Sequence, residues 1–234
     1  MKISFEEIIR PHRVSVKDLF PSLTFSEIVS PHMSPDMAFF GKDTQLENLT
    51  GANLKLKAFQ EQHPHALLAN GYLEVRAFYN TSRFERNGPH GKEYRNIHLG
   101  TDFWVPPQTP IHALFDSEVV LSHHNNYHKD YGPLLVLRHT LGAFPFYTLY
   151  GHLSLSSLKK SPKGAVIKKG EVFAWIGDET ENGHWPSHLH FQVITDLLQE
   201  TENYNGVAFP SEIDIWKERC PDPNFIFLEN LNGR

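Results

Sequence analysis

The sequence predicts a mainly β domain, an antiparallel β-sheet or sandwich, with a helical or irregular N-terminal extension. Three observations support this fold class. From about residue 67, short runs of alternating polar and apolar residues are separated by Gly, Pro and Asn, the pattern of strands joined by turns. Before residue 67, prolines at 21 and 31 end two short segments of helical character. Two segments, 97–105 and 188–194, each combine an apolar face with a histidine-bearing face.

The N-terminal extension, residues 1–66, has the local patterns of short helices. Residues 15–20 directly precede Pro21, and residues 26–29 lie just before Pro31. Both segments predict helical turns, because proline cannot continue a helix. Residues 43–62 contain five large apolar residues with poor periodicity and favour a further helix. We expect this extension to pack on the main domain.

The main domain is predicted to span residues 67–200 and to consist of short strands. A C-terminal tail, 201–234, contains Pro-Asp-Pro-Asn and is predicted to be a loop that packs back onto the domain. The expected strands, in chain order, cover residues 72–79, 97–105, 109–113, 118–121, 134–139, 146–152, 171–176 and 188–194.

Composition excludes several classes of protein. The net charge of −5 argues against a general nucleic-acid binder, whose surface is usually basic. A single cysteine, Cys220, excludes an internal disulfide and a Cys-rich zinc cluster. No apolar run reaches the roughly 20 residues of a membrane span. Residues 1–7 lack the apolar region of a secretory signal, so the cytoplasm is the default expectation.

Histidine is unusually frequent, with 15 residues. We expect most of them to lie on the surface or to make structural hydrogen bonds inside the fold. His139, near the end of a predicted strand, is expected to be of this structural kind.

Segment 188–194 places two imidazoles on one face of a strand. Side chains alternate between the faces of a strand, so His188, His190 and Gln192 share one face. The apolar residues Leu189 and Phe191 face the core. The two histidines are then within reach of one metal ion or one substrate atom.

Segment 97–105 has the same design. His98, Gly100 and Asp102 share one face of the expected strand, and the glycine between the two ligand candidates has no side chain to obstruct them. A helix would also bring positions four apart together. The glycine, the β-branched residues and the following Pro-Pro favour a strand.

These residue types predict a zinc site. Catalytic zinc commonly has three protein ligands, often two histidines and a carboxylate, and keeps a position for water. His98, Asp102 and one of His188 and His190 supply that set. The metal would activate the water. The remaining histidine of the pair and His152 are candidates for the base and for stabilising the oxyanion.

One alternative is a cupin-type metal enzyme, because His-x-His on a strand also occurs in cupin barrels that bind iron or manganese. That fold expects a glutamate about four residues after the second histidine, where this chain has Ile194. No His-Glu-x-x-His helix motif and no Gly-x-Ser-x-Gly elbow is present.

Three motifs in order resemble a known family. His-Leu-Gly-Thr-Asp-Phe at 98–103 and Gln-Thr-Pro-Ile-His-Ala at 108–113 are similar to the first half of the signature of M23 (lysostaphin/LytM-type) zinc peptidases. Tyr-Gly-His-Leu at 150–153 and His-Leu-His-Phe at 188–191 match its other two motifs. The resemblance covers roughly residues 94–195. Each motif alone is weak, but the combination is specific.

The resemblance implies a LytM-like groove built on an antiparallel sheet, of the duplicated-hybrid type, and a zinc cofactor. It implies His98, Asp102 and His190 as zinc ligands, and His152 and His188 as general base and stabilisers of the tetrahedral intermediate. Family members are endopeptidases that cut peptide stems or crosslinks in bacterial peptidoglycan. The expected partner is thus a peptide or peptidoglycan substrate, without nucleic acid or a membrane span.

Departures from the family pattern leave the substrate open. Residues 178–186 replace a Gly/Thr/Ser-rich loop, and Gln192 replaces a common glutamate. An enzyme that cuts the cell wall also needs an export route. A catalytically silent regulator that binds a partner in the groove is a second interpretation. The family further suggests that an upstream residue, Asn80 or Asn87, could occupy the fourth zinc position in a latent form.

Overall fold

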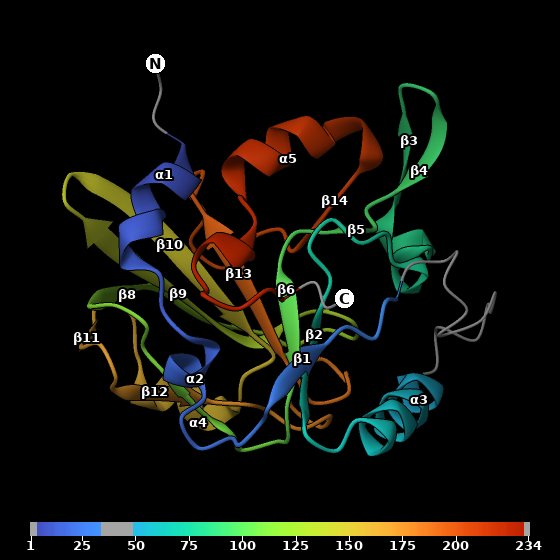
Figure 1. The fold of residues 1–234 in the computed structure, drawn as a ribbon. Helices are drawn as coiled ribbons and strands as arrows, with labels where there is room; N and C mark the ends of the chain where they lie inside the picture. Colours follow the sequence, from blue (N-terminus) through green and yellow to red (C-terminus); the bar gives the residue numbers. More distant parts are fainter. Residues whose placement is uncertain (1–3, 34–48, 232–234) are drawn as a thin grey trace.

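A sheet of eight strands lies at the centre of the protein (Figure 1). The computed structural model describes residues 4–33 and 49–231. The strands of this sheet are β1 (Glu27–Val29), β2 (Ala66–Asn70), β6 (Thr101–Trp104), β8 (Ser117–Asn125), β9 (Gly132–Leu141), β10 (Phe144–Gly151), β11 (Val166–Ile167) and β13 (Leu189–Ile194). Their order is β1-β2-β6-β13-β10-β9-β8-β11. β1 and β2 are parallel, and all other neighbours are antiparallel. The predicted mainly β, antiparallel fold is confirmed.

Smaller elements surround this sheet. Three strand pairs join β3 (Glu85–Gly88) to β4 (Gly91–Tyr94), β5 (Ile97–His98) to β14 (Val207–Ala208), and β7 (Pro110–His112) to β12 (Val172–Trp175). The α-helices are α1 (Phe5–Ile9), α2 (Val16–Leu19), α3 (Leu49–Gln62), α4 (Leu155–Lys160) and α5 (Ile213–Arg219). Short 3₁₀ turns cover Arg10–His12, Ala77–Tyr79, Ser82–Phe84, Pro210–Glu212 and Pro223–Phe225. Within the described ranges, no helix has the length and apolar character needed to cross a membrane.

The N-terminal residues form part of the main core. Ser4 and Ser15 begin α1 and α2 with capping boxes, which satisfy free backbone N–H groups at a helix start. Leu19 and Phe20 are fully buried in the same apolar cluster as Phe103 of β6. The predicted division into residues 1–66, 67–200 and 201–234 stays a prediction.

Two predictions for the N-terminal region differ from the structure. Residues 26–29 were predicted to form a helical turn, which is wrong, because 27–29 pairs with β2 as an edge strand. Hydrogen bonding to a neighbouring strand outweighs such a short local preference. For the expected helix 43–62, the structure has α3 from Leu49 to Gln62, and residues 43–48 lie outside the described ranges.

The predicted strand at 72–79 is also wrong. Gly71 and Leu73 have positive φ angles of 117° and 58°, so the chain turns directly after β2. Val75 makes an isolated bridge to Ile97, and a 3₁₀ turn follows. The segment is therefore a folded loop in which Arg76 and Phe78 are buried and Val75 is exposed.

The expected strand 97–105 is broken into β5 and β6. His98 consequently pairs with β14, in a different sheet from Asp102. At Gly100, between the two strands, a Cβ atom would lie 2.6 Å from the backbone oxygen of Phe191 and 2.8 Å from the His190 ring. Glycine is needed here for close approach of the two segments.

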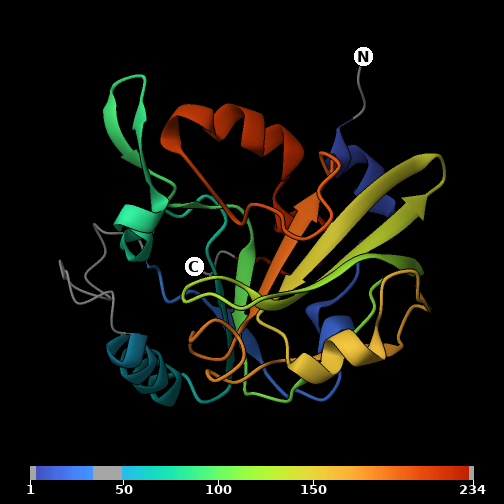
Figure 2. The same cartoon turned by 180° about the vertical axis from the view of Figure 1, so that it is seen from behind.

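Two apolar clusters enclose the central sheet. Leu189, Phe191 and Val193 point into the larger cluster, as their alternation predicts. On the other side, Leu99 and Ile194 pack in a cluster with Trp216 and Cys220. Figure 2 shows α5 beside the strands β13 and β10. The C-terminal tail was predicted to be a loop, but it contains β14 and α5 because it covers this second apolar face.

Candidate active site

The site begins with two adjacent strands. In the pairing of β13 with β6, His190 lies opposite Asp102. Directly opposed residues of neighbouring strands point to the same side of the sheet. The Nδ1 atom of His190 is accordingly 3.2 Å from Oδ1 of Asp102.

His98 completes a group of three from β5. Its Nε2 atom lies 2.8 Å from Nδ1 of His190 and 3.4 Å from Oδ1 of Asp102. Zinc bonds of about 2.0–2.1 Å in tetrahedral geometry separate two ligand atoms by about 3.3 Å. These three buried residues therefore have the spacing of a zinc site, and they form a group that could hold a metal ion within the described part of the chain.

The hydrogen bonds behind the two rings determine which nitrogen carries hydrogen. Nδ1 of His98 is 3.0 Å from the carbonyl oxygen of Gly71, which can only accept, so this nitrogen donates. Nε2 of His190 is 2.9 Å from Oε1 of Gln192. The Gln192 amide is oriented by its N–H₂, which donates to the carbonyl of Asn205. The nitrogens of His98 and His190 that face Asp102 are therefore lone-pair acceptors.

Asp102 adds a third acceptor. Among the described residues, its Oδ1 atom has no hydrogen-bond donor, whereas Oδ2 accepts from Nη1 of Arg76 at 2.5 Å. Three acceptor atoms thus face one another at 2.8–3.4 Å in a buried place. Such an arrangement is repulsive unless a cation lies between them. The two histidines and the carboxylate fit a zinc ion in type, number and spacing.

His152 and His188 lie beside this group. Nδ1 of His152 donates to the carbonyl oxygen of Asn182 at 2.9 Å, and Nδ1 of His188 donates to that of Pro186 at 2.6 Å. Each ring therefore keeps Nε2 as an acceptor. The two ring centroids are 4.2 Å apart, and Nε2 of His188 is 3.8 Å from Oδ1 of Asp102. The structure thus brings all five sequence-predicted site residues together.

Burial sets the charges in the site. It lowers the pKa of His98 to about 3 and that of His188 to about 4, and it holds the pKa of His152 well below its usual value. Burial opposes the charge of Asp102, but His98 and Arg76 keep its pKa well below the usual range. Near neutral pH these three imidazoles are neutral and the carboxylate is ionised, which are the forms that bind metals.

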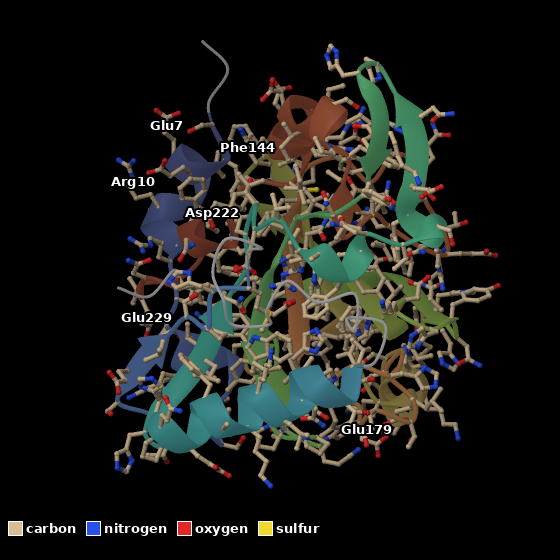
Figure 3. The ribbon with its side chains drawn as sticks, turned by 90° about the vertical axis from the view of Figure 1, so that its right-hand side faces the viewer. Glu7, Arg10, Phe144, Glu179, Asp222 and Glu229 are labelled. Carbon is tan, nitrogen blue, oxygen red and sulfur yellow. The ribbon has the colours of Figure 1, made fainter. Side chains whose placement is uncertain are left out.

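Aromatic residues and two cavities border the site. Trp104 stacks on His188 with 4.4 Å between ring centroids. A cavity of about 60 Å³, lined by Tyr131 and Trp185, reaches His152 and His190. A larger cavity of about 640 Å³ lies beyond Trp104, between α3 and the loop 178–187. In Figure 3, Glu179 of this loop lies near one end of α3.

Five hydrogen-bond partners of the site residues were not predicted from the sequence. They are Gly71, Arg76, Asn182, Pro186 and Gln192. Only Gln192 could be expected from the sequence, because the alternation in 188–194 places it on the same face as His190. Neither candidate for a latent fourth ligand reaches the site: Asn80 and Asn87 are exposed, and the Asn80 side chain accepts from Asn96.

Comparisons with known proteins agree with the sequence motifs. Residues 96–204 match the model of Peptidase family M23, a range that contains all five site residues. No curated protein sequence matches the chain. A zinc containing peptidase from Vibrio cholerae is 28% identical over 47% of this chain and 30% of its own, with a TM-score of 0.35.

Two further solved structures are similar over about half of the chain. The catalytic domain of the antimicrobial peptidase lysostaphin from Staphylococcus simulans is 20% identical over 52% of this chain and 80% of its own, with a TM-score of 0.36. The catalytic domain of a prophage-encoded M23 protein from Enterococcus faecalis is 19% identical over 52% of this chain and 82% of its own, with a TM-score of 0.36. The match to the family model, and not the structural similarity, assigns residues 96–204 to peptidase family M23, a family of zinc-dependent hydrolases.

Proposed function

We propose that this protein is a zinc metalloendopeptidase that hydrolyses peptide bonds through a metal-activated water. The observation that carries the proposal is the meeting of three buried ligand atoms, Nε2 of His98, Oδ1 of Asp102 and Nδ1 of His190, at 2.8–3.4 Å from one another. Membership of the M23 family supports the same reaction class.

In this proposal His98, Asp102 and His190 would hold the zinc ion. When bound, the metal would supply Lewis-acid polarisation of the substrate carbonyl and would lower the pKa of water to about 7. The remaining steps fall to residues of the chain. The carbonyl oxygen of Gly71 and the Gln192 side chain keep the two imidazoles turned toward the common centre.

His152 and His188 are the proposed catalytic residues. Their Nδ1 atoms are held by backbone carbonyl groups, so each Nε2 atom is oriented and unprotonated. One imidazole takes a proton from the attacking water as general base. It is then a donor that can stabilise the negative charge on the carbonyl oxygen and return the proton to the leaving amine, while the second imidazole supports the same charge.

We further propose peptidoglycan stems or crosslinks as the substrate class. The support is the match of residues 96–204 to the M23 family, whose motifs this chain retains. The loop 178–186 differs from the usual family pattern, and four of its residues line the larger cavity together with Lys57 and Asn53. This loop is where we expect selectivity between peptides to arise.

The deciding experiment incubates zinc-loaded protein with purified peptidoglycan and, separately, with generic peptides. Mass spectrometry of the products identifies the cleaved bond. We expect cleavage of a stem or crosslink that stops after chelation and returns with added zinc. The His152→Ala variant serves as a zinc-containing control without activity.

Two other outcomes would contradict the proposal. A protein that holds zinc but cleaves neither substrate would favour the silent regulator that binds a partner in the groove. A protein purified with iron instead of zinc would favour the cupin-type alternative, for which the family match provides no support.

A further inference from the structure

We propose that Arg76 is a positioning residue that keeps Asp102 in a one-oxygen mode of metal binding. Its guanidinium engages Oδ2 of the carboxylate, so that Oδ1 alone faces the metal. This inference rests on the proposed function, because it takes Asp102 as a ligand. Nothing in the M23 motifs assigns a role to position 76, which lies 26 residues before Asp102.

The contact between the two side chains is buried and direct. Arg76 is 3% exposed and Asp102 is fully buried. Nη1 of Arg76 donates to Oδ2 of Asp102 at 2.5 Å, a short contact between opposite charges. The other carboxylate oxygen, Oδ1, has no donor in the described part of the chain. Oδ2 of Asp102 therefore binds the guanidinium, and Oδ1 is the oxygen available to a metal ion.

A second carboxylate holds the guanidinium itself. Nε of Arg76 donates to Oε2 of Glu74 at 3.0 Å, and the Glu74 side chain is also buried. A planar guanidinium bound at two edges has a fixed orientation, which a lysine ammonium could not copy. The fixed guanidinium of Arg76 thus holds the carboxylate of Asp102 in one orientation.

The same hydrogen-bonded chain continues to the catalytic candidates. The Asn70 amide donates to Oε2 of Glu74 at 3.0 Å, and Nε1 of Trp104 donates to Oδ1 of Asn70 at 2.8 Å. Trp104 stacks on His188. A continuous set of contacts therefore links Arg76 with a metal ligand at one end and a proposed catalytic histidine at the other.

The turn that carries Arg76 also orients a second ligand. The carbonyl oxygen of Gly71 accepts from Nδ1 of His98. A Cβ atom at Gly71 would lie 2.2 Å from Nη2 of Arg76, so glycine is needed for the guanidinium to reach its place. Residues 71–76 thus act on two of the three ligands, although none of them would touch the metal.

The test compares Arg76→Gln and Arg76→Lys with the wild-type chain and with Arg138→Gln. Arg138 makes an exposed ion pair with Glu118 and serves as the matched control. Zinc affinity is measured by competition with a chromogenic chelator, and the visible spectrum of the cobalt(II)-loaded protein reports the ligand geometry.

We expect Arg76→Gln to bind zinc about 10–100-fold more weakly, the usual effect of removing a partner of a metal ligand. Its cobalt spectrum should change as Oδ2 becomes free to bind the metal. Arg76→Lys keeps the positive charge but lacks the planar guanidinium. It should show a smaller loss of zinc affinity with a similar change of the cobalt spectrum. Arg138→Gln should match the wild type in both measurements.

Circular dichroism establishes which variants are folded. If Arg76→Gln does not fold, Arg76→Lys decides the question. A folded Arg76 variant with wild-type zinc affinity and cobalt spectrum would overturn this inference and leave the proposed function intact. Failure of the wild-type chain to bind zinc would instead overturn the proposed function, and this inference with it.

Discussion

Two kinds of buried histidine occur in this protein, and they differ in one respect. His139 on β9 and His188 at the site are both almost fully buried, and burial lowers the pKa of each to about 4. Both nitrogens of His139 have partners: Nδ1 is 3.3 Å from the carbonyl of Asp116 and Nε2 is 2.7 Å from the Thr148 hydroxyl. In His188, Nδ1 donates to the carbonyl of Pro186, whereas Nε2 has no hydrogen-bond donor or acceptor among residues 4–33 and 49–231 and faces Oδ1 of Asp102 at 3.8 Å.

This difference separates a structural histidine from a functional candidate. Burial and a lowered pKa are common to both regions and do not distinguish them. A ring nitrogen that is left as a free acceptor, and that faces other acceptors, marks the site. His139 instead packs between Phe115 and Phe146, as expected for a histidine with a structural hydrogen bond.

The largest effect is expected from removing a ligand. His98→Ala or Asp102→Ala should lose both zinc and hydrolysis, because two ligands no longer complete the site. Metal analysis after dialysis and a peptide-cleavage assay measure the two losses. Zinc retained in full by Asp102→Ala would assign the metal to other residues.

The next largest effect concerns catalysis alone. His152→Ala should retain zinc and reduce kcat by roughly 10²–10⁴-fold, the usual contribution of a general acid–base residue. The readout is steady-state kinetics on zinc-loaded protein of confirmed metal content. Full activity of this variant would remove His152 from the proposed mechanism.

A smaller effect is expected where a ligand keeps its place but loses its support. Gln192→Leu removes the acceptor for Nε2 of His190 and should weaken zinc binding by about 10–100-fold. Gln192→Glu restores an acceptor and serves as the rescue variant. Equal chelator competition by the leucine variant and the wild type would contradict this role of Gln192.

The smallest effect on zinc and activity is expected at the structural histidine. His139→Gln should leave both unchanged but alter the pH dependence of stability. The folded pKa of His139, about 4, lies below its ordinary value of 6.5, so the unfolded chain binds more protons between these values. His139 therefore lowers the free energy of unfolding as pH falls through that window, by up to about 3 kcal/mol.

Urea unfolding of zinc-free protein between pH 6.5 and 4 measures this dependence. The slope should be smaller in His139→Gln than in the wild type, and His12→Gln, at an exposed histidine, is the control. An unchanged slope in His139→Gln would show that His139 is protonated equally in both states.

The sequence by itself determined the strand that carries the site and its candidate residues. Alternation in 188–194 predicted which side chains face the core and which face the site, because a strand repeats every two residues. The order of the histidine motifs indicated the family and named the five residues that the fold brings together. Gly100 was recognised as a gap between ligand candidates, although its contact with Phe191 and His190 was not.

Only the tertiary structure decided which atom of each residue is free. The acceptor for His98 comes from Gly71, 27 residues away, and that for His152 comes from Asn182, 30 residues away. Such contacts leave no local pattern, since the chain between the partners can have almost any sequence. The role of Arg76 could not be predicted for the same reason. A turn brings Arg76 to Asp102, whereas the alternation in 72–79 predicts a strand. Local periodicity reports which face a residue occupies, whereas hydrogen-bond partners depend on segments that meet only when the chain has folded.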